Sequence, residues 1–282
     1  MSWRQSALSS ANSGPYVDAA TFELEARKEA ARLRNVATRR AVSTGVLALI
    51  IFVAVWWGLV AAGVANPLFV STPLAVLTAF VHLVGETSTW YDVWQTLYAS
   101  IMALILGGGL GVAGGVVFAS SSSIRRGLNP YVAIMNGIPR PALAPIFILW
   151  FGLGAAPKVL VGASLVFFVL LLNTIVGMTT IDQDIETLSK SMGMKRGQYF
   201  LYVQLPSALP SILAGLRLGA VYSVLGVVVS EIVASRHGLG QLLISFTNAL
   251  DLASAFAVVA LMAALAVSLD LAVRLLENAV LP

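Results

Sequence analysis

Long apolar stretches constrain this chain more than any other feature of its sequence. A helix needs about 20 apolar residues to cross a hydrocarbon core about 30 Å thick. Stretches of that kind predict spans at about 43–63, 95–119, 129–150, 158–179, 207–233 and 252–276. They lack the alternating pattern of barrel strands. The expected fold is therefore an all-α integral membrane protein with about six transmembrane helices.

The composition agrees with a membrane protein and argues against several kinds of chemistry. Charged residues make up 11% of the chain and hydrophobic residues 58%, whereas soluble domains carry about 25% charged residues. The sequence has no cysteine, and its two histidines lack the spacing of metal motifs, so no metal site is expected. It contains no Walker GxxxxGK(S/T) motif and no catalytic constellation, so no catalytic residues are expected and the chain is not expected to be an enzyme.

The placement of lysine and arginine predicts the orientation in the membrane. Basic residues gather in the first 42 residues and in the loops after the second and fourth spans, whereas residues 64–91 contain none. The positive-inside rule then makes both termini cytoplasmic.

Three parts are expected along the chain. Residues 1–42 form a partly helical cytoplasmic segment, either a helix near the membrane or a poorly ordered tail. Residues 43–94 hold the first span and an outer interfacial helix from Pro73 to Val84, which is too short to cross. Residues 95–278 form the core and include a cytoplasmic segment at 180–206.

The third span contains three prolines, in "IPRPALAPIFILWFGLG". Pro139, Pro141 and Pro145 each remove a backbone donor, so this helix is expected to bend and to face a bundle interior or a cavity. Arg140 lies among them, and an arginine inside a membrane is costly. It is expected either to pair structurally or to contact an anion that passes through. Pro139, Arg140 and Pro141 are therefore candidate pathway residues.

Two other spans carry residues that predict helix contacts. Gly107, Gly111 and Gly115 recur every four residues, which predicts close helix packing, with a role in lining a pathway as the alternative. In the fifth span, Arg217 and Glu231 are fourteen residues apart. That is about 21 Å along a helix, so each needs another partner.

Structural pairing is expected for both of these charged residues, and Glu231 is also a candidate pathway residue. Near the inner end of the last span, Asp270 and Arg274 are four residues apart and are expected to pair with each other.

The segment 180–206 interrupts the apolar sequence with polar and basic residues. It predicts a helix from Ile185 to Met192, a break at Gly193, a second helix from about Lys195 to Val203, and a span that starts at Pro206. Its apolar side comprises Leu188, Met192, Tyr199, Phe200 and Val203. Such a segment either carries force from a docked partner or only lies on the membrane, and its residues alone leave both interpretations open.

This stretch resembles the cytoplasmic signature of permease subunits of bacterial ABC importers. That signature is Glu-Ala-Ala, three residues, Gly, nine residues, Ile, one residue and Leu-Pro. Aligned on Gly193, the matching positions are Val203, Leu205 and Pro206. The chain departs from the signature at the front, where the Glu-Ala-Ala positions hold Thr187, Leu188 and Ser189, with Glu186 one residue early.

Three further stretches resemble the branch of that family that imports sulfonates, taurine, nitrate and related small molecules. They are "IPRPALAPIFILWFGLG" at 138–154, "LPSALPSILAGLRLG" at 205–219 and "SEIVASRHGLGQLL" at 230–243. The resemblance runs from about Asn66 to Arg274. The spacing from Gly to Leu-Pro is fairly specific for the superfamily, whereas the branch stretches do not fix the substrate.

The resemblance implies a multi-pass permease of the bacterial inner membrane that pairs, usually with a second copy of itself. It also implies two cytoplasmic ATPase subunits, which would use ATP and Mg, and an extracytoplasmic binding protein that delivers the solute. Lipid is expected around the spans, and no nucleic acid or cofactor is expected for this chain. The residues implied in ATPase coupling are Glu186, Thr187, Leu188, Ser189, Met192, Gly193, Met194, Leu205 and Pro206.

The branch resemblance, together with Arg140, favours a small organic anion such as a sulfonate as the substrate. Nitrate, an aromatic carboxylate and a pyrimidine precursor of thiamine are the alternatives. An ion-coupled secondary transporter is the competing class, but it would need carboxylates near the bilayer midplane and repeated broken helices.

Overall fold

In a computed structural model of the chain, the described residues are 32, 40, 43–64 and 66–280. The partly helical segment predicted at 1–42 lies outside them, apart from its residues 32 and 40. The chain divides into two compact units, 1–64 and 65–282. In the first unit, the helix Ser43–Ala61 has 19 residues and a mean hydropathy of 2.3, so it is long and apolar enough to cross a membrane.

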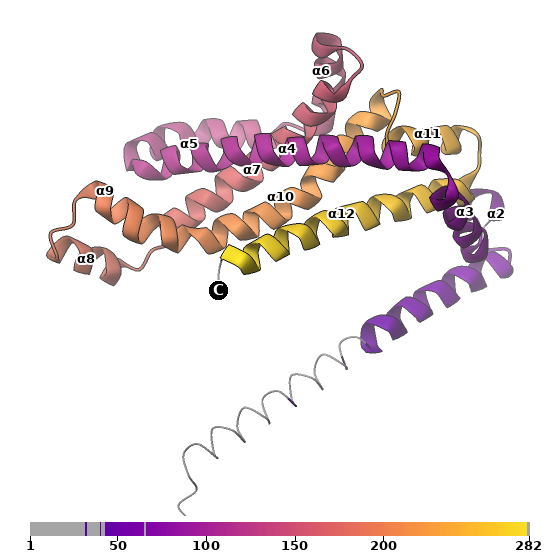
Figure 1. The fold of residues 1–282 in the computed structure, drawn as a ribbon, viewed down its shortest axis with the longest axis horizontal. Helices are drawn as coiled ribbons and strands as arrows, with labels where there is room; N and C mark the ends of the chain where they lie inside the picture. The colour runs from indigo at the N-terminus through magenta and orange to yellow at the C-terminus, as the bar shows by residue number, and fades with distance from the viewer. Residues whose placement is uncertain (1–31, 33–39, 41–42, 65, 281–282) are drawn as a thin grey trace, which may run out of the picture. The chain divides into compact units, whose positions relative to one another are not determined.

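The regular secondary structure of the second unit, in its described part, is all helical (Figure 1). Its elements, in chain order, are α2 (Pro67–Val70), α3 (Pro73–Gly85), α4 (Thr87–Ser120), α5 (Ser122–Gly137), the 3-10 turn η1 (Arg140–Leu143), α6 (Ala144–Phe151), α7 (Ala155–Thr179), α8 (Gln183–Ser191), α9 (Arg196–Tyr199), the π-helical turn η2 (Phe200–Gln204), α10 (Leu205–Val233), α11 (Leu239–Asn248) and α12 (Leu252–Val280).

The expected fold class is confirmed. Residues 43–64 and 66–280 contain no strand. Five of their helices have the length and apolar character to cross a membrane, and a bent pair makes six if it forms one span. One predicted boundary differs clearly at α4, which begins at Thr87 rather than about residue 95, because the helix restarts directly after the break at Glu86.

Three long helices, α4, α7 and α10, form the centre of the second unit, and α12 packs along α10 (Figure 1). The predicted packing role of the α4 glycines is confirmed. A Cβ atom at Gly111 would lie 2.6 Å from the carbonyl oxygen of Phe167, and one at Gly107 would collide with the backbone of Ala163. Glycine is needed at both positions because the α4 and α7 backbones touch there.

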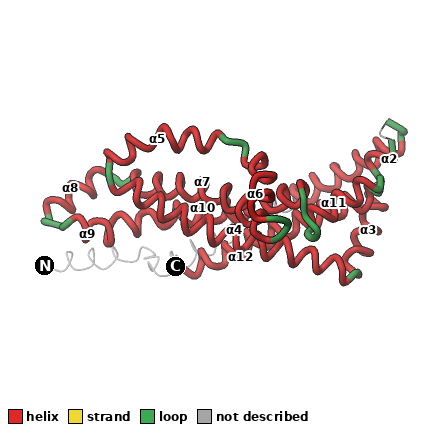
Figure 2. The backbone as a smooth tube through the Cα atoms, turned by 90° about the horizontal axis from the view of Figure 1, so that it is seen from above, coloured by secondary structure: helices red, strands yellow, loops and turns green. Residues whose placement is uncertain are grey.

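The predicted bend in the third span is confirmed and is sharp. The helices 123–137 and 140–151 meet at 80° across a short break that contains Pro139. Figure 2 shows α5 running alongside the bundle before the chain turns into α6. Pro141 lies in the first turn of η1 and Pro145 in the first turn of α6, where their missing N–H groups leave no helical bond unmade.

Different short helices lie at the two ends of the second unit (Figure 1). At one end lies α3, the short helix that the sequence predicted from Pro73 to Val84. Its Leu83 is buried and packs with Leu239 of α11 and Val258 of α12. At the other end lie α8 and α9, which follow the last turn of α7.

One expectation for the segment 180–206 is wrong. The second cytoplasmic helix is not separate from the next span, since residues 196–233 form one continuous helical stretch of 38 residues. The π turn Phe200–Gln204 joins the two parts, and the Leu205 N–H donates to the Phe200 carbonyl. A wider turn accommodates a proline without a full break, so Pro206 lies in the first turn of α10 while the chain continues as a helix.

Candidate functional site

The helix α8 has well-defined ends. At its start, the Asp182 carboxylate accepts a hydrogen bond of 3.0 Å from the Asp184 N–H. At its end, the Gly193 N–H donates to the Lys190 carbonyl and the Met194 N–H donates to the Ser189 carbonyl. These two bonds form a Schellman motif, which needs a left-handed residue. Gly193 provides it, with a φ of +71°.

An apolar stripe on α8 faces away from the rest of the unit. Ile185, Leu188 and Met192 are 46%, 61% and 69% exposed. Their spacing of three and four residues places them on one face of the helix. Ser189, one of the residues at the Glu-Ala-Ala positions, is buried instead and donates to the Ile185 carbonyl. A small residue at 189 therefore serves packing, whereas Leu188 remains free for contact.

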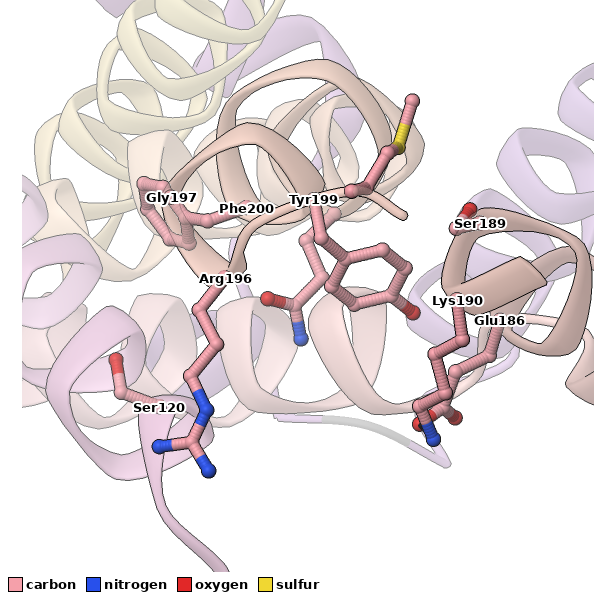
Figure 3. Close-up of a pocket in the computed structure, with 10 residues that line it drawn as sticks. Ser120, Glu186, Ser189, Lys190, Arg196, Gly197, Tyr199 and Phe200 are labelled. Atoms are coloured by element: carbon pink, nitrogen blue, oxygen red, sulfur yellow. Dashed lines mark hydrogen bonds and ion pairs between the residues drawn. The ribbon is translucent and has the colours of Figure 1, made fainter. Parts of the chain in front are cut away.

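A cavity of about 590 Å³ lies behind α8. Side chains from four elements line it, including Ser120 at the end of α4, Ser189 and Lys190 of α8, Arg196 and Tyr199 of α9, and Phe200 of η2 (Figure 3). Lys190 pairs with Glu186 at 2.7 Å on its exposed rim, and this hydrogen bond raises the pKa of Lys190. Met194 also lines the cavity, so the turn after α8 lies close to α4 and α9.

The coupling residues named from the sequence thus fall into two groups. Those from Glu186 to Met194 lie together on α8 and its terminal turn. Leu205 and Pro206 lie at the start of α10, beyond the π turn. Gln204 connects this start to α7, because its side-chain amide donates to the Met178 carbonyl at 3.4 Å.

Arg140 lies at the break in the third span and is 6% exposed. Its Nη1 donates to the carbonyls of Met135 and Ile138, and its Nη2 donates to the Asn136 side chain. The Met135 carbonyl would normally accept from residue 139, but Pro139 has no N–H to offer. The arginine therefore replaces a donor that the proline removes.

Arg140, Asn136 and Phe168 also line a cavity of about 360 Å³ between the broken span and α7. The guanidinium carbon lies 4.3 Å from the centre of the Phe168 ring. Among the candidate pathway residues, Pro139 and Pro141 flank Arg140 in the chain and fix the break beside this cavity.

Glu231 is not among the residues that line the Arg140 cavity. It is fully buried and forms an ion pair of 3.0 Å with Lys158 of α7. Its carboxylate also accepts from Thr96 of α4 and from the Gly240 N–H. The requirement for a partner is thus confirmed, and the partner comes from another span.

Arg217 and Asp270 also have the partners that the sequence required. Arg217 lies 3.8 Å from Asp270 and 3.5 Å from Glu277 of α12. Asp270 also pairs with Arg274 at 2.7 Å, as the i,i+4 spacing predicted.

Sequence reasoning missed Lys158 and Thr96 as functional neighbours of Glu231. The predicted fourth span begins at Lys158, which lies in the first turn of α7 and is only 6% exposed. The available signal was electrostatic. A carboxylate inside a span needs a cation at the same depth, and Lys158 is near the matching end of a neighbouring span.

Residues 107–282 match the family described as binding-protein-dependent transport system inner membrane component. The chain therefore belongs to this family of ABC importer permease subunits. It is a multi-pass inner membrane protein, and permease subunits of this family are not themselves enzymes.

Curated relatives span most of the chain. It is 29% identical to the putative aliphatic sulfonates transport permease SsuC of Bacillus subtilis, over 90% of this chain and 92% of the relative. It is 27% identical to the taurine transport system permease TauC of Escherichia coli, over 86% and 90%. It is 30% identical to the formylaminopyrimidine transport permease ThiX of Halalkalibacterium halodurans, over 80% and 90%.

A solved structure shares the fold. A chain of the inward-facing MetNI methionine ABC transporter superposes with a TM-score of 0.62 at 19% identity, over 70% of this chain and all of that one. At this identity the likeness concerns the fold alone.

Proposed function

We propose that this permease carries a small organic anion of the sulfonate or taurine type across the inner membrane. Two relatives of similar length are named for aliphatic sulfonates and taurine, which supports this class. A buried arginine beside a cavity suits an anionic solute. A thiamine-type pyrimidine precursor is the second candidate, since a third relative is named for formylaminopyrimidine.

We further propose that α8 is the element through which an ATPase subunit drives the permease. The observation that carries this proposal is the exposed apolar stripe of Ile185, Leu188 and Met192. An amphipathic helix with an exposed apolar face can lie in a hydrophobic groove of a partner. The buried Ser189 and the Schellman turn at Gly193 hold the stripe in a fixed direction.

Movement of α8 would reach the spans by two routes. Through the Gly193 turn it passes to α9, the π turn and α10, which form one continuous helical stretch. Through the Gln204 contact with Met178 it passes to the end of α7. In this proposal the chain acts as two copies, with ATP hydrolysis in two separate ATPase subunits and a binding protein on the opposite side of the membrane. Both termini and α8 are then cytoplasmic.

The pathway, in this proposal, runs beside the broken third span. Pro139 and Pro141 hold the break open, and Arg140 presents its charge to the cavity. Glu231 has a different role, because its carboxylate already accepts hydrogen bonds from Lys158, Thr96 and the Gly240 N–H. It stabilises the fold next to the pathway.

Reconstitution into liposomes tests the function. The permease, its ATPase and its binding protein are expected to take up taurine or an alkanesulfonate only when ATP is supplied on the ATPase side. Uptake by the permease without an ATPase would contradict the coupling proposal. ATP-dependent uptake of formylaminopyrimidine but not of sulfonates would favour the second candidate.

A further inference from the structure

We propose that Arg140, Asn136 and Tyr222 form a binding subsite for the anionic head group of the solute, with Phe168 beside its alkyl part. This inference rests on the proposed function and adds the chemistry of one site within the pathway. All four residues line the same cavity of about 360 Å³. That volume is at the small end of ligand pockets.

The charge on Arg140 is not cancelled within the described part of the chain. Its polar partners there are two backbone carbonyls and the Asn136 amide oxygen, all of them formally neutral. No carboxylate of the described residues lies within 4 Å of its guanidinium. An arginine stays charged in proteins, and a charge inside a membrane is costly without a counter-ion. An anion in the cavity would supply that counter-ion.

Some hydrogen-bond donors of Arg140 also lack a partner among the described residues. A guanidinium has five N–H groups, and Arg140 uses three of them on Met135, Ile138 and Asn136. The two left over match the paired oxygens of a carboxylate or a sulfonate. The Asn136 amide N–H groups and the Tyr222 hydroxyl make no hydrogen bond within the described residues, so further donors are available for a third oxygen.

The remaining walls suit a short alkyl chain. Leu165, Phe168 and Leu172 of α7 line the cavity next to these donors. The lining of this one cavity therefore offers an oxyanion with a small apolar tail a charge, hydrogen-bond donors and apolar side chains. Sulfonates and carboxylates share this chemistry, and the experiment separates them.

The test measures binding to the purified full-length permease in nanodiscs, without ATPase or binding protein, by equilibrium dialysis. The probes are radiolabelled ethanesulfonate, propionate and ethylammonium. We expect saturable binding of ethanesulfonate, propionate or both, and none of ethylammonium. If ethanesulfonate alone binds, the head group is a sulfonate. The absence of saturable anion binding by the wild-type chain would overturn the proposal.

Three variants assign the binding to the subsite. Arg140→Gln keeps an amide donor for the Met135 carbonyl but removes the charge, so anion affinity should fall at least about tenfold, as for other charge-assisted pairs. Arg140→Lys should fall between wild type and Arg140→Gln, because it keeps the charge without the paired donors. Tyr222→Phe removes only a hydroxyl and should weaken binding by a few-fold.

A folded Arg140→Gln variant with wild-type affinity would overturn the subsite. ATP-driven uptake measured in parallel separates this inference from the proposed function. If uptake by the wild type is normal and Arg140→Gln binds unchanged, the subsite is wrong and the function stands. If Arg140→Gln loses binding but the wild type shows no ATP-driven uptake, the subsite stands and the function is wrong.

Discussion

Lys158 of α7 and Glu231 of α10 form an ion pair with 3.0 Å between Nζ and Oε1, and both side chains are almost completely buried. The pair also orders the chain that leads into α11. The Lys158 ammonium donates to the His237 carbonyl at 2.6 Å, and the Glu231 carboxylate accepts from the Gly240 N–H at 2.9 Å. One ion pair therefore joins two long helices to the loop after α10 and to the first turn of α11.

Breaking this pair from one side should destabilise the protein strongly. Either Lys158→Met or Glu231→Gln leaves one buried charge without its partner, which costs about 3–5 kcal/mol. The double variant should lose less than the sum of the two, because no unpaired charge remains. Denaturant titration in detergent micelles measures both effects. Strictly additive losses would show that the two side chains are not coupled.

The α4 glycines provide a test with a matched control in the same helix. A methyl group at Gly111 would lie 2.6 Å from the Phe167 carbonyl oxygen, so Gly111→Ala should cost about 1–3 kcal/mol by pushing α4 away from α7. Gly109 has open space around it, and Gly109→Ala should be neutral or stabilise by up to about 1 kcal/mol. Thermal unfolding of both variants and of wild type measures these changes in stability. Equal losses would refute close α4–α7 contact.

Gly193→Pro should uncouple the permease from its ATPase while the chain still inserts in the membrane. Proline cannot adopt the φ of +71° found at Gly193, and it removes the N–H that bonds to Lys190. Co-purification with the ATPase and transport-coupled ATPase activity are the measurements. Gly197→Ala is the control, because Gly197 is helical and has open space around it. Undiminished co-purification of Gly193→Pro would count against the coupling role.

Leu188→Asp should weaken ATPase association at least about tenfold, since a charge in an apolar groove loses its hydration. Leu188 is 61% exposed, so the fold itself should tolerate the change. The conservative variant Leu188→Met keeps an apolar side chain of similar volume and should retain association. Titration of the permease with fluorescently labelled ATPase gives both affinities. If Leu188→Asp binds like Leu188→Met, the stripe on α8 is not the docking surface.

Much of the coupling segment was predictable because it depends on local rules. The break at Gly193 follows from the chemistry of helix ends, and the acidic first turn of α8 follows from the helix dipole. The continuity of α9 with α10 was not predictable in this way. A proline at 206 normally indicates a helix start, and only the π turn before it allows the helix to continue.

The partners of the charged groups inside the membrane were also predictable only where they lie close in the sequence. Spacing along one helix excluded a pair between Arg217 and Glu231, and it predicted the pair between Asp270 and Arg274, which are 2.7 Å apart. It could not name Lys158 as the partner of Glu231, because these residues are 73 positions apart in the chain. Their meeting depends on how α7 and α10 pack.

The membrane-spanning helical fold, the bend at the prolines and the family signature around Gly193 all follow from the amino-acid sequence. These features depend on hydrophobicity, on missing backbone donors and on short-range spacing, all of which are local. The packing of the helices, in contrast, sets which charges meet and which face of α8 is exposed. It also brings Arg140, which compensates for the donor missing at Pro139, to the wall of a cavity. Those outcomes depend on the approach of helices far apart in the chain, which packing sets and local sequence does not encode.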